Sequence, residues 1–332
     1  MKIKLLPSAV GRSARPACAI ALLFVAGRVA AQSPPNLSAS ASAAAGGSQV
    51  SLTVRATAGT KIRLESSADL LAWSGHRTLV STGTNTWLES IAGIPGLRFF
   101  RAVEVTDAEA LTGDHLATSA GDAVIHPINH ASFVLSWNGR MIFNDPVGGA
   151  APYQGLPKAD LILVSHSHGD HFHAATLDAV RKDGTWIIAP AAVYASLSTA
   201  LKALTIPLAN GESTNVFGLT VEAVPAYNAN HPRGVGNGYV VTLGGRRLYM
   251  SGDTGDIPET RALRDIDVAF LCMNVPFTMT VAQAASVTRA FVPRILYPYH
   301  YRNQDGTRAN LNTLRSQVGT DLAIEIRERA WY

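Results

Sequence analysis

The sequence predicts an α/β domain that follows a smaller all-β module. From residue 122 to residue 332, short apolar runs of strand type alternate with segments of helical spacing, which is α/β organisation. Residues 49–105 instead hold brief alternating stretches separated by turn signals, a pattern typical of a sandwich-like β-module. The 332 residues provide enough apolar content for both units.

Residues 1–31 have the three parts of a secretory signal peptide. An apolar run at 17–27, shorter than a membrane-spanning helix requires, is followed by small residues ending at Ala31. The basic residues that precede this run are Lys2, Lys4, Arg12 and Arg15. We therefore predict cleavage after Ala31, a periplasmic or secreted protein, and no transmembrane segment after removal of the signal. A buried N-terminal helix is the alternative.

Removal of the signal changes the charge of the chain. The whole sequence carries a net charge of +4, but residues 1–31 hold five of its 28 Lys and Arg and none of its 24 Asp and Glu. The remaining chain has a balance of −1, so we expect no nucleic-acid partner. Only Cys272 remains of the two cysteines, and its apolar surroundings predict a core residue.

Residues 32–48 are of low complexity and predict a flexible linker. The module at 49–105 resembles a small β-domain often attached to exported bacterial proteins, on the segments Glu65–Trp73 (ESSADLLAW) and Arg98–Arg101 (RFFR). This resemblance implies an accessory role. We interpret the module as a spacer, with carbohydrate or surface binding as the alternative, and residues 106–121 as its connection to the domain at 122–332.

Apolar runs and turn signals predict the elements of the α/β domain. Asn138-Gly139 predicts a hairpin between strands at 123–137 and 140–146, and Gly244-Gly245 predicts a second hairpin. Further strands are predicted at 160–164, 186–190, 219–224, 239–243 and 294–298. Helices are predicted at 174–181, 192–204 and 281–291.

A candidate metal site begins in the segment Ser165–His173 (SHSHGDHFH), between a predicted strand and a predicted helix. Its metal-binding side chains are His166, His168, Asp170 and His171. Alternation lets the first two point the same way, and we expect Gly169 to permit a sharp turn before the other two. Two ions, one on each pair, fit this arrangement better than one. A histidine-rich exposed tract is the alternative.

The pattern H-x-H-x-D-H after an apolar strand resembles the signature of the metallo-β-lactamase superfamily. Other segments extend the resemblance over residues 122–332: Asn129–Phe133 (NHASF) with Gly139–Pro146 (GRMIFNDP), Tyr249–Thr254 (YMSGDT) and Tyr297–Tyr301 (YPYHY). The opening hairpin is similar to the branch of ascorbate-6-phosphate lactonase-like and N-acylphosphatidylethanolamine phospholipase D-like proteins. The resemblance implies a four-layer αβ/βα sandwich with a binuclear site, in which Asp253 bridges the ions and His300 completes the second.

One position departs from the family pattern. The superfamily usually places a histidine after the strand that reads Val221–Asn228 here, but position 228 is asparagine and the nearest histidine is His231. Either His231 is the third ligand of the first ion, or Asn228 replaces it weakly, or only one ion binds tightly. Because an amide oxygen is a poor zinc ligand beside imidazole, we favour His231.

The ligand set implies an exported, zinc-dependent binuclear hydrolase that uses a metal-bridging hydroxide to cleave an ester, lactone or phosphodiester bond. Mn²⁺ and Fe²⁺ are alternatives to Zn²⁺, and Asp170 and Asp253 are the candidate catalytic residues. We expect a small-molecule or lipid-like substrate. Candidate substrate contacts are His130, Tyr227, Asn228, Asn274, Tyr299, Tyr301 and Arg302. A nuclease of the same fold and a non-catalytic metal-binding protein are the rival functions.

Overall fold

The computed structural model describes residues 4–5, 20–22, 36–44, 47–90, 98–107 and 110–332. The chain divides into two compact units, the first comprising residues 1–117 with 122–125 and the second residues 118–121 with 126–332. The predicted signal peptide lies outside the described residues except for two short strands, β1 (Lys4–Leu5) and β2 (Ile20–Leu22). The predicted connection at 106–121 contains a strand, β9 (Gly113–Thr118).

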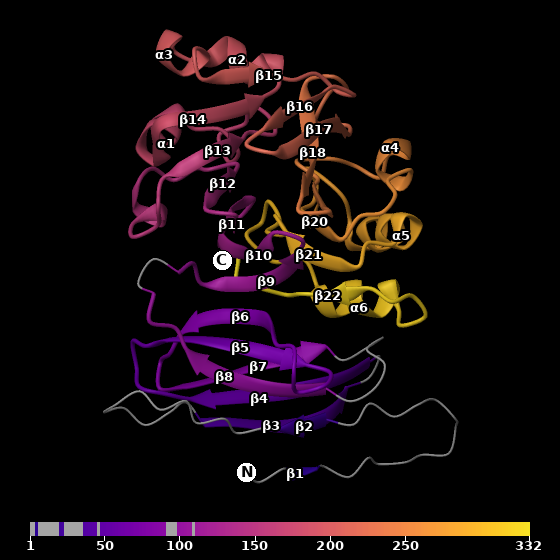
Figure 1. Cartoon of the computed structure of the whole chain (residues 1–332). Coiled ribbons are helices and arrows are strands. Elements are labelled where there is room, and N and C mark those ends of the chain that lie inside the picture. Colours follow the sequence, from indigo (N-terminus) through magenta and orange to yellow (C-terminus); the bar gives the residue numbers. More distant parts are fainter. Residues whose placement is uncertain (1–3, 6–19, 23–35, 45–46, 91–97, 108–109) are drawn as a thin grey trace. The chain divides into compact units, whose positions relative to one another are not determined.

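Two sheets form the first unit (Figure 1). One is antiparallel, with order β3-β4-β7, and the other pairs β8, β5 and β6. The bounds of these strands are β3 (Asn36–Ala44), β4 (Gly47–Arg55), β5 (Lys61–Ser67), β6 (Ser74–Val80), β7 (Thr84–Ser90) and β8 (Arg98–Glu104). Buried residues of β4, β5 and β8 share one core, namely Leu52, Val54, Ile62, Leu64, Phe100 and Ala102.

Strand β3 occupies most of the segment that the sequence predicts to be a flexible linker. It pairs with β4 along its whole length, from Asn36 opposite Arg55 to Ala44 opposite Gly47. Low complexity argues only that a segment cannot bury much apolar surface. Backbone hydrogen bonds to a neighbouring strand do not require that burial, so the composition of residues 36–44 does not prevent a strand.

The two recognised segments of this module contact each other. The Arg101 guanidinium lies 2.6 Å from the Glu65 carboxylate and stacks over the Trp73 ring, 4.2 Å from its centroid. Within the segment Glu65–Trp73, the Asp69 carboxylate accepts hydrogen bonds from the backbone N–H of Leu71 and Ala72. The motif residues therefore fix a loop and a strand pairing.

Two sheets also form the second unit. The first has the order β10-β11-β12-β13-β14-β15, antiparallel at β11–β12 and parallel from β12 to β15. Its strands are β10 (Gly121–Asn129), β11 (Ser132–Trp137), β12 (Arg140–Asn144), β13 (Ala159–Leu163), β14 (Arg181–Ala189) and β15 (Thr205–Pro207).

The second sheet runs in sequence order from β16 to β22. It is antiparallel from β16 to β19 and parallel from β19 to β22. Its strands are β16 (Ser213–Val216), β17 (Leu219–Ala226), β18 (Gly236–Leu243), β19 (Arg246–Met250), β20 (Val268–Cys272), β21 (Ile295–Tyr299) and β22 (Glu325–Ile326).

Helices lie on the outer sides of the two sheets, which confirms the predicted αβ/βα sandwich (Figure 1). Beside the first sheet are α1 (Ala174–Val180), α2 (Ala191–Ser196) and α3 (Thr199–Lys202), and beside the second are α4 (Pro258–Arg261), α5 (Val281–Phe291) and α6 (Leu311–Val318). The predicted helix at 192–204 is interrupted, because Leu197 is extended and the Ser198 hydroxyl caps α3. No helix among the described residues is long and apolar enough to cross a membrane.

Aromatic rings join the two sheets of the second unit. Phe133 on β11 stacks on Phe270 on β20, with centroids 4.2 Å apart, and Phe270 also stacks on Tyr297 of β21. The Trp331 ring packs edge-on against Phe133, Phe270 and Tyr299. These side chains are buried, so their packing fixes how the ends of the two sets of strands face each other.

We predict that Phe270→Ala lowers the free energy of unfolding of the second unit by about 3–5 kcal/mol, because it leaves a cavity between the sheets. Phe277→Ala is the matched control, since the Phe277 side chain is 36% exposed and its loss is expected to cost less than about 1 kcal/mol. Chemical denaturation measures both values. Equal losses for the two variants would contradict the assigned role of Phe270.

Candidate metal centre

The seven predicted metal ligands come from loops that follow strands of both sheets. The segment after β13 supplies His166, His168, Asp170 and His171. His231 lies in the loop between β17 and β18, Asp253 follows β19, and His300 follows β21. Because the sheets face each other, these strand ends meet at one edge of the sandwich.

The turn after β13 is held by its own backbone. The carbonyl oxygen of His168 accepts hydrogen bonds from the N–H of His171 and of Phe172, at 3.0 and 2.8 Å. Gly169 does not have a positive φ, and a Cβ atom there would meet nothing within 4 Å. The turn that we expected Gly169 to permit is present, but it does not use the positive φ that glycine allows.

Gly252 is the glycine on which the site depends. Its φ is +57°, and a Cβ atom would lie 2.8 Å from the carbonyl oxygen of Asn237. Its N–H donates a hydrogen bond of 3.0 Å to the Tyr299 hydroxyl. Only glycine fits this turn without strain, and the turn presents the next residue, Asp253, between the two sheets.

One group of histidine nitrogens surrounds one oxygen of Asp253. His168 Nδ1 lies 3.1 Å from His166 Nε2 and 3.1 Å from His231 Nε2. Asp253 Oδ2 lies 3.4 Å from His231 Nε2 and 3.9 Å from His166 Nε2. Four atoms that can bind a metal thus converge, with His231 in the third histidine position.

A second group surrounds the other oxygen of Asp253. Asp253 Oδ1 lies 3.1 Å from His171 Nε2 and 3.3 Å from His300 Nε2, and these two nitrogens are 2.9 Å apart. Asp170 Oδ2 lies 3.4 Å from His300 Nε2 and 3.8 Å from His171 Nε2. Asp253 therefore stands between two groups, each with three further ligand atoms.

The spacing of these atoms suits a small divalent ion. Four ligands about 2.1 Å from a tetrahedral ion stand roughly 3.4 Å apart, in the middle of the distances found here. Among the described residues, Asp253 Oδ1 is one of few buried polar side-chain atoms without a hydrogen-bond partner. A buried carboxylate oxygen without a partner is costly, and a cation at this point would compensate it.

Two residues that are not ligands orient the histidines. The buried Asp145 carboxylate accepts hydrogen bonds from His171 Nδ1 at 2.8 Å and from the backbone N–H and the hydroxyl of Ser165. Asn228 Oδ1 lies 3.0 Å from His231 Nδ1. Each contact keeps the proton on Nδ1 and leaves Nε2 free to bind a metal.

The role of Asp145 was missed in the sequence, although it lies within the segment GRMIFNDP that carries the resemblance. A carboxylate directly after an apolar strand was the available signal. Asn228 was considered as a weak metal ligand, but it has a different role. Its amide oxygen orients His231, and its amide nitrogen donates a hydrogen bond of 3.3 Å to the carbonyl oxygen of Asp253.

The electrostatics of the site favour an ionised Asp253 and separate His166 and His231 from His171. Burial, with the nearby charge of His171, lowers the pKa of His166 to about 2, and burial lowers the pKa of His231. Burial opposes ionisation of Asp253, but the charges of His300 and His171 outweigh it and hold its pKa far below the usual range. Burial likewise opposes protonation of His171, but Asp253 and Asp145 outweigh it and raise its pKa well above normal.

The remaining predicted residues have varied positions. His130 lies at the second group, with its Nε2 3.1 Å from Asp170 Oδ2. The Tyr227 hydroxyl donates to Glu259, and Asn274 Oδ1 accepts from the Thr278 hydroxyl. Tyr299 and Tyr301 are buried, and Arg302 is exposed. His173 occupies the N-cap position of α1 without a side-chain cap bond, and its Nδ1 lies 2.8 Å from the Thr176 hydroxyl, outside the metal-binding groups.

A small cavity of about 40 Å³ opens beside the first group. It is lined by His166, His168, His231 and Asp253 together with Ser165, Ser167, Ala226, Asn230, Pro232, Val235, Gly236 and Asn237. None of the predicted substrate contacts lines this cavity. The Tyr227 and Asn274 side chains are hydrogen-bonded to Glu259 and Thr278 instead. Asn230 and Val235, which the sequence did not single out, lie on its wall.

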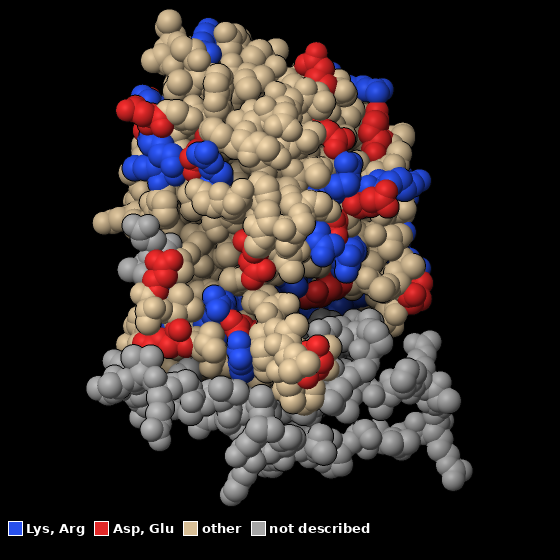
Figure 2. All heavy atoms as spheres, in the orientation of Figure 1, with Lys and Arg blue, Asp and Glu red and all other residues tan. Residues whose placement is uncertain are grey.

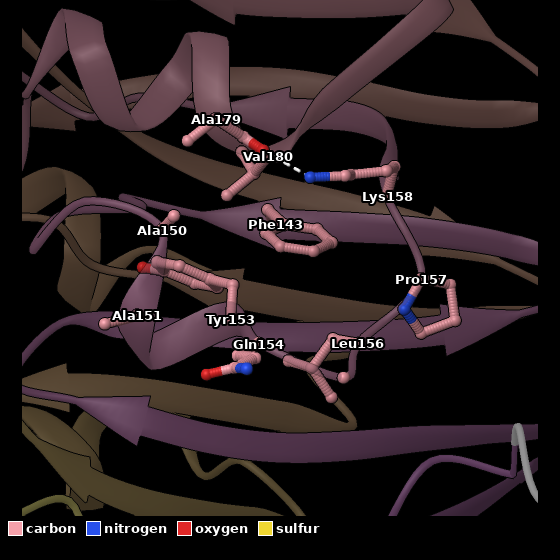
Figure 3. A pocket seen from close by; sticks show the side chains of 11 residues that line it. Phe143, Ala150, Ala151, Tyr153, Gln154, Leu156, Pro157, Lys158, Ala179 and Val180 are labelled. Atoms are coloured by element: carbon pink, nitrogen blue, oxygen red, sulfur yellow. Dashed lines mark hydrogen bonds between the residues drawn. The ribbon is translucent and has the colours of Figure 1, made fainter.

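A larger cavity of about 500 Å³ lies elsewhere in the second unit, between β12, α1 and the segment 150–158 (Figure 3). Its lining residues include Phe143, Tyr153, Leu156 and Val180. Lys158 also lines it, and the Lys158 ammonium group donates a hydrogen bond to the carbonyl oxygen of Ala179. None of the metal-binding residues lines it, so size alone does not locate the reactive site.

Comparisons with known proteins agree with this geometry. A family model described as a beta-lactamase superfamily domain matches residues 134–301, about half of the chain. Two relatives are named UPF0173 metal-dependent hydrolase. The one from Thermococcus kodakarensis is 31% identical over 210 residues, covering 60% of this chain and 93% of the relative. The one from Thermoplasma acidophilum is 32% identical over 206 residues, covering 58% and 88%.

Solved structures give the same result. A protein described as a metal-dependent hydrolase, from Parabacteroides distasonis, is 39% identical with a TM-score of 0.60, covering 67% of this chain and 100% of its own. The metallo hydrolase Igni18 from Ignicoccus hospitalis is 24% identical with a TM-score of 0.54, covering 62% and 94%. The likeness to Igni18 is evidence for a shared fold and for nothing further.

We predict that His231→Ala removes one metal equivalent per chain, because a ligand of the first group is lost, whereas Asn228→Ala retains both ions with roughly 10–100-fold weaker binding of the first. Metal analysis of the purified variants, with titration for affinity, measures both. If His231→Ala keeps two equivalents at unchanged affinity, His231 is not a ligand.

Proposed function

The chain belongs to the beta-lactamase superfamily, and on that premise we propose that it is an exported, metal-dependent hydrolase with a binuclear centre. His166, His168 and His231 would hold one divalent ion. Asp170, His171 and His300 would hold the other, and Asp253 would contact both. Zinc suits a set of five imidazoles and two carboxylates best, and Mn²⁺ and Fe²⁺ also accept these ligands.

One observation carries this proposal. By the interatomic distances, Oδ2 of the buried Asp253 lies near His166 and His231 and Oδ1 lies near His171 and His300, and Oδ1 has no hydrogen-bond partner. A single ion would face only one of these groups and would leave the ligand atoms of the other group without a cation.

Divalent ions bound in such a pair lower the pKa of a water molecule to near neutrality and polarise the oxygen of the bond under attack. The residues of this chain supply the geometry. Asp253 sets the distance between the two groups, Asp145 keeps the His171 proton on Nδ1, and His130 holds the Asp170 carboxylate. Such a mechanism needs no serine or cysteine nucleophile. Cys272 is buried in β20.

The substrate that we propose is a small or lipid-like molecule with an ester, lactone or phosphodiester bond, the class that the sequence resemblance implies. On the face shown in Figure 2, basic and acidic side chains are interspersed. A nucleic acid, which selects continuous basic surfaces, fits this face less well.

We expect hydrolysis of at least one ester, lactone or phosphodiester substrate to be lost on treatment with a chelator and restored by Zn²⁺ or Mn²⁺. His168→Ala should lower kcat/KM at least 100-fold, because it removes a ligand. His173→Ala is the matched control, since that histidine of the same segment binds Thr176 and is expected to leave activity within about twofold. A substrate screen with and without chelator measures these effects.

Activity that survives both chelation and His168→Ala would overturn the proposed mechanism. Tight binding of two ions without hydrolysis of any of the three substrate classes would instead favour a metal-binding protein.

The proposed export has its own test. When the full chain is expressed in a bacterium with a periplasm, we predict a mature N-terminus at Gln32, because small residues precede that position. Mass spectrometry of the periplasmic fraction measures it, with a variant lacking residues 17–27 as the control that stays inside. Recovery of the intact chain, starting at Met1, in the cytoplasm would contradict export.

A further inference from the structure

The Tyr332 hydroxyl has three close partners beside the second metal-binding group. It accepts hydrogen bonds from the backbone N–H of Tyr301 at 2.9 Å and of Arg302 at 3.1 Å. Its third partner is His130 Nδ1 at 3.0 Å. A tyrosine hydroxyl carries one proton and two lone pairs. Since the two backbone groups can only donate, the hydroxyl proton remains for His130 Nδ1.

This count fixes the tautomer of His130. In neutral imidazole one nitrogen donates and the other accepts. Because Nδ1 accepts from Tyr332, the proton of His130 lies on Nε2, which faces Asp170 Oδ2 at 3.1 Å. A donor chain therefore runs from the backbone of Tyr301 and Arg302, through Tyr332 and His130, to the Asp170 carboxylate.

The backbone around this chain is also held. The N–H of His130 donates to the carbonyl oxygen of Trp331 at 3.2 Å, and the N–H of His300 donates to the carbonyl oxygen of His130 at 3.1 Å. The Trp331 ring is buried in the aromatic core. Tyr332 thus follows a fixed residue and has little freedom to leave its position.

The ring of Tyr332 has partners of its own. The Arg302 guanidinium stacks over it at 4.1 Å from the centroid, and the His130 ring packs edge-on against it with centroids 5.8 Å apart. Arg308 Nη2 donates to the carbonyl oxygen of Tyr332 at 3.3 Å. Such contacts fix the hydroxyl in the one direction that satisfies all three of its hydrogen bonds.

We propose that Tyr332 is a positioning residue of the metal centre, which locks His130 as the Nε2–H tautomer so that it holds Asp170 in place for the second ion. This role rests on the proposed binuclear centre, but the tautomer itself does not require a bound metal. Outer partners of this kind commonly change metal affinity by roughly 10–100-fold when they are removed.

The first test follows the tautomer. Two-bond ¹H–¹⁵N correlation spectra of the metal-free protein at neutral pH are expected to show His130 with its proton on Nε2. In Tyr332→Phe, which keeps the ring and its stacking, Nδ1 loses its donor and only Asp170 still favours the proton on Nε2, so a fraction of the Nδ1–H form should become detectable. Tyr249→Phe is the matched control, because it removes a buried hydroxyl that pairs with Thr260 instead.

The second test follows the metal. Titration of Tyr332→Phe is expected to show about 10–100-fold weaker binding of the second ion, with the first ion unchanged. If Tyr332 acts through His130, the double variant Tyr332→Phe with His130→Ala should bind the second ion no more weakly than His130→Ala alone. Tyr249→Phe should lose some stability and no metal affinity.

The outcomes separate this proposal from the proposed function. His130 with its proton on Nδ1 in the parent protein, or unchanged tautomer and affinity in Tyr332→Phe, would overturn the role of Tyr332. Failure of the parent protein to bind a second ion would instead overturn the binuclear centre. Circular dichroism of each variant identifies any that has merely failed to fold, and Tyr332→Leu then repeats the test with a smaller side chain that cannot donate a hydrogen bond to His130.

Discussion

The burial of Asp253 is the constraint on which the rest of this structure depends. Its carboxylate lies between two groups of imidazole nitrogens, with one oxygen facing each group and Oδ1 without a hydrogen-bond partner. An ionised group in this position is stable only if positive charge lies close to both oxygens. The sheets must therefore hold loops from β13, β17, β19 and β21 within a few ångströms of each other, and the aromatic contacts between Phe133 and Phe270 provide that alignment.

Periodicity and turn signals predicted most of the longer strands and the longest helix of the second unit, because these carry a local pattern. The strands β15, β16, β20 and β22 were not predicted. The helix at 281–291 and the hairpin at Asn138-Gly139 were predicted correctly, and the capping box of Thr280 and Gln283 shows how local the helix signal is. Strand β3 was not predicted, because its stability comes from pairing with β4, which composition does not reveal. The break in the helix at 192–204 depends on Ser198, whose capping role competes with a helical pattern on both sides.

Ligands clustered in one turn are visible in a sequence, and those of the segment 166–171 were therefore the easiest to predict. Asp253 and His300 followed from strand-end contexts that carry the family resemblance. Asp145 also follows a strand, but nothing in the sequence links it to His171 Nδ1, and Tyr332 had no signal at all, since its importance lies in its contact with His130 Nδ1. Residues that orient ligands through a single hydrogen bond can come from anywhere in a chain, so only three-dimensional structure reveals them.

The turn from Asn228 to His231 has a consequence for how such sites can change. Its two end residues exchange backbone hydrogen bonds, and the asparagine amide orients the histidine ring, so ligand and support lie within four consecutive residues. In the proposed centre, this turn supplies the imidazole from its last position instead of its first. A search that fixes each ligand to one alignment column would overlook such a protein.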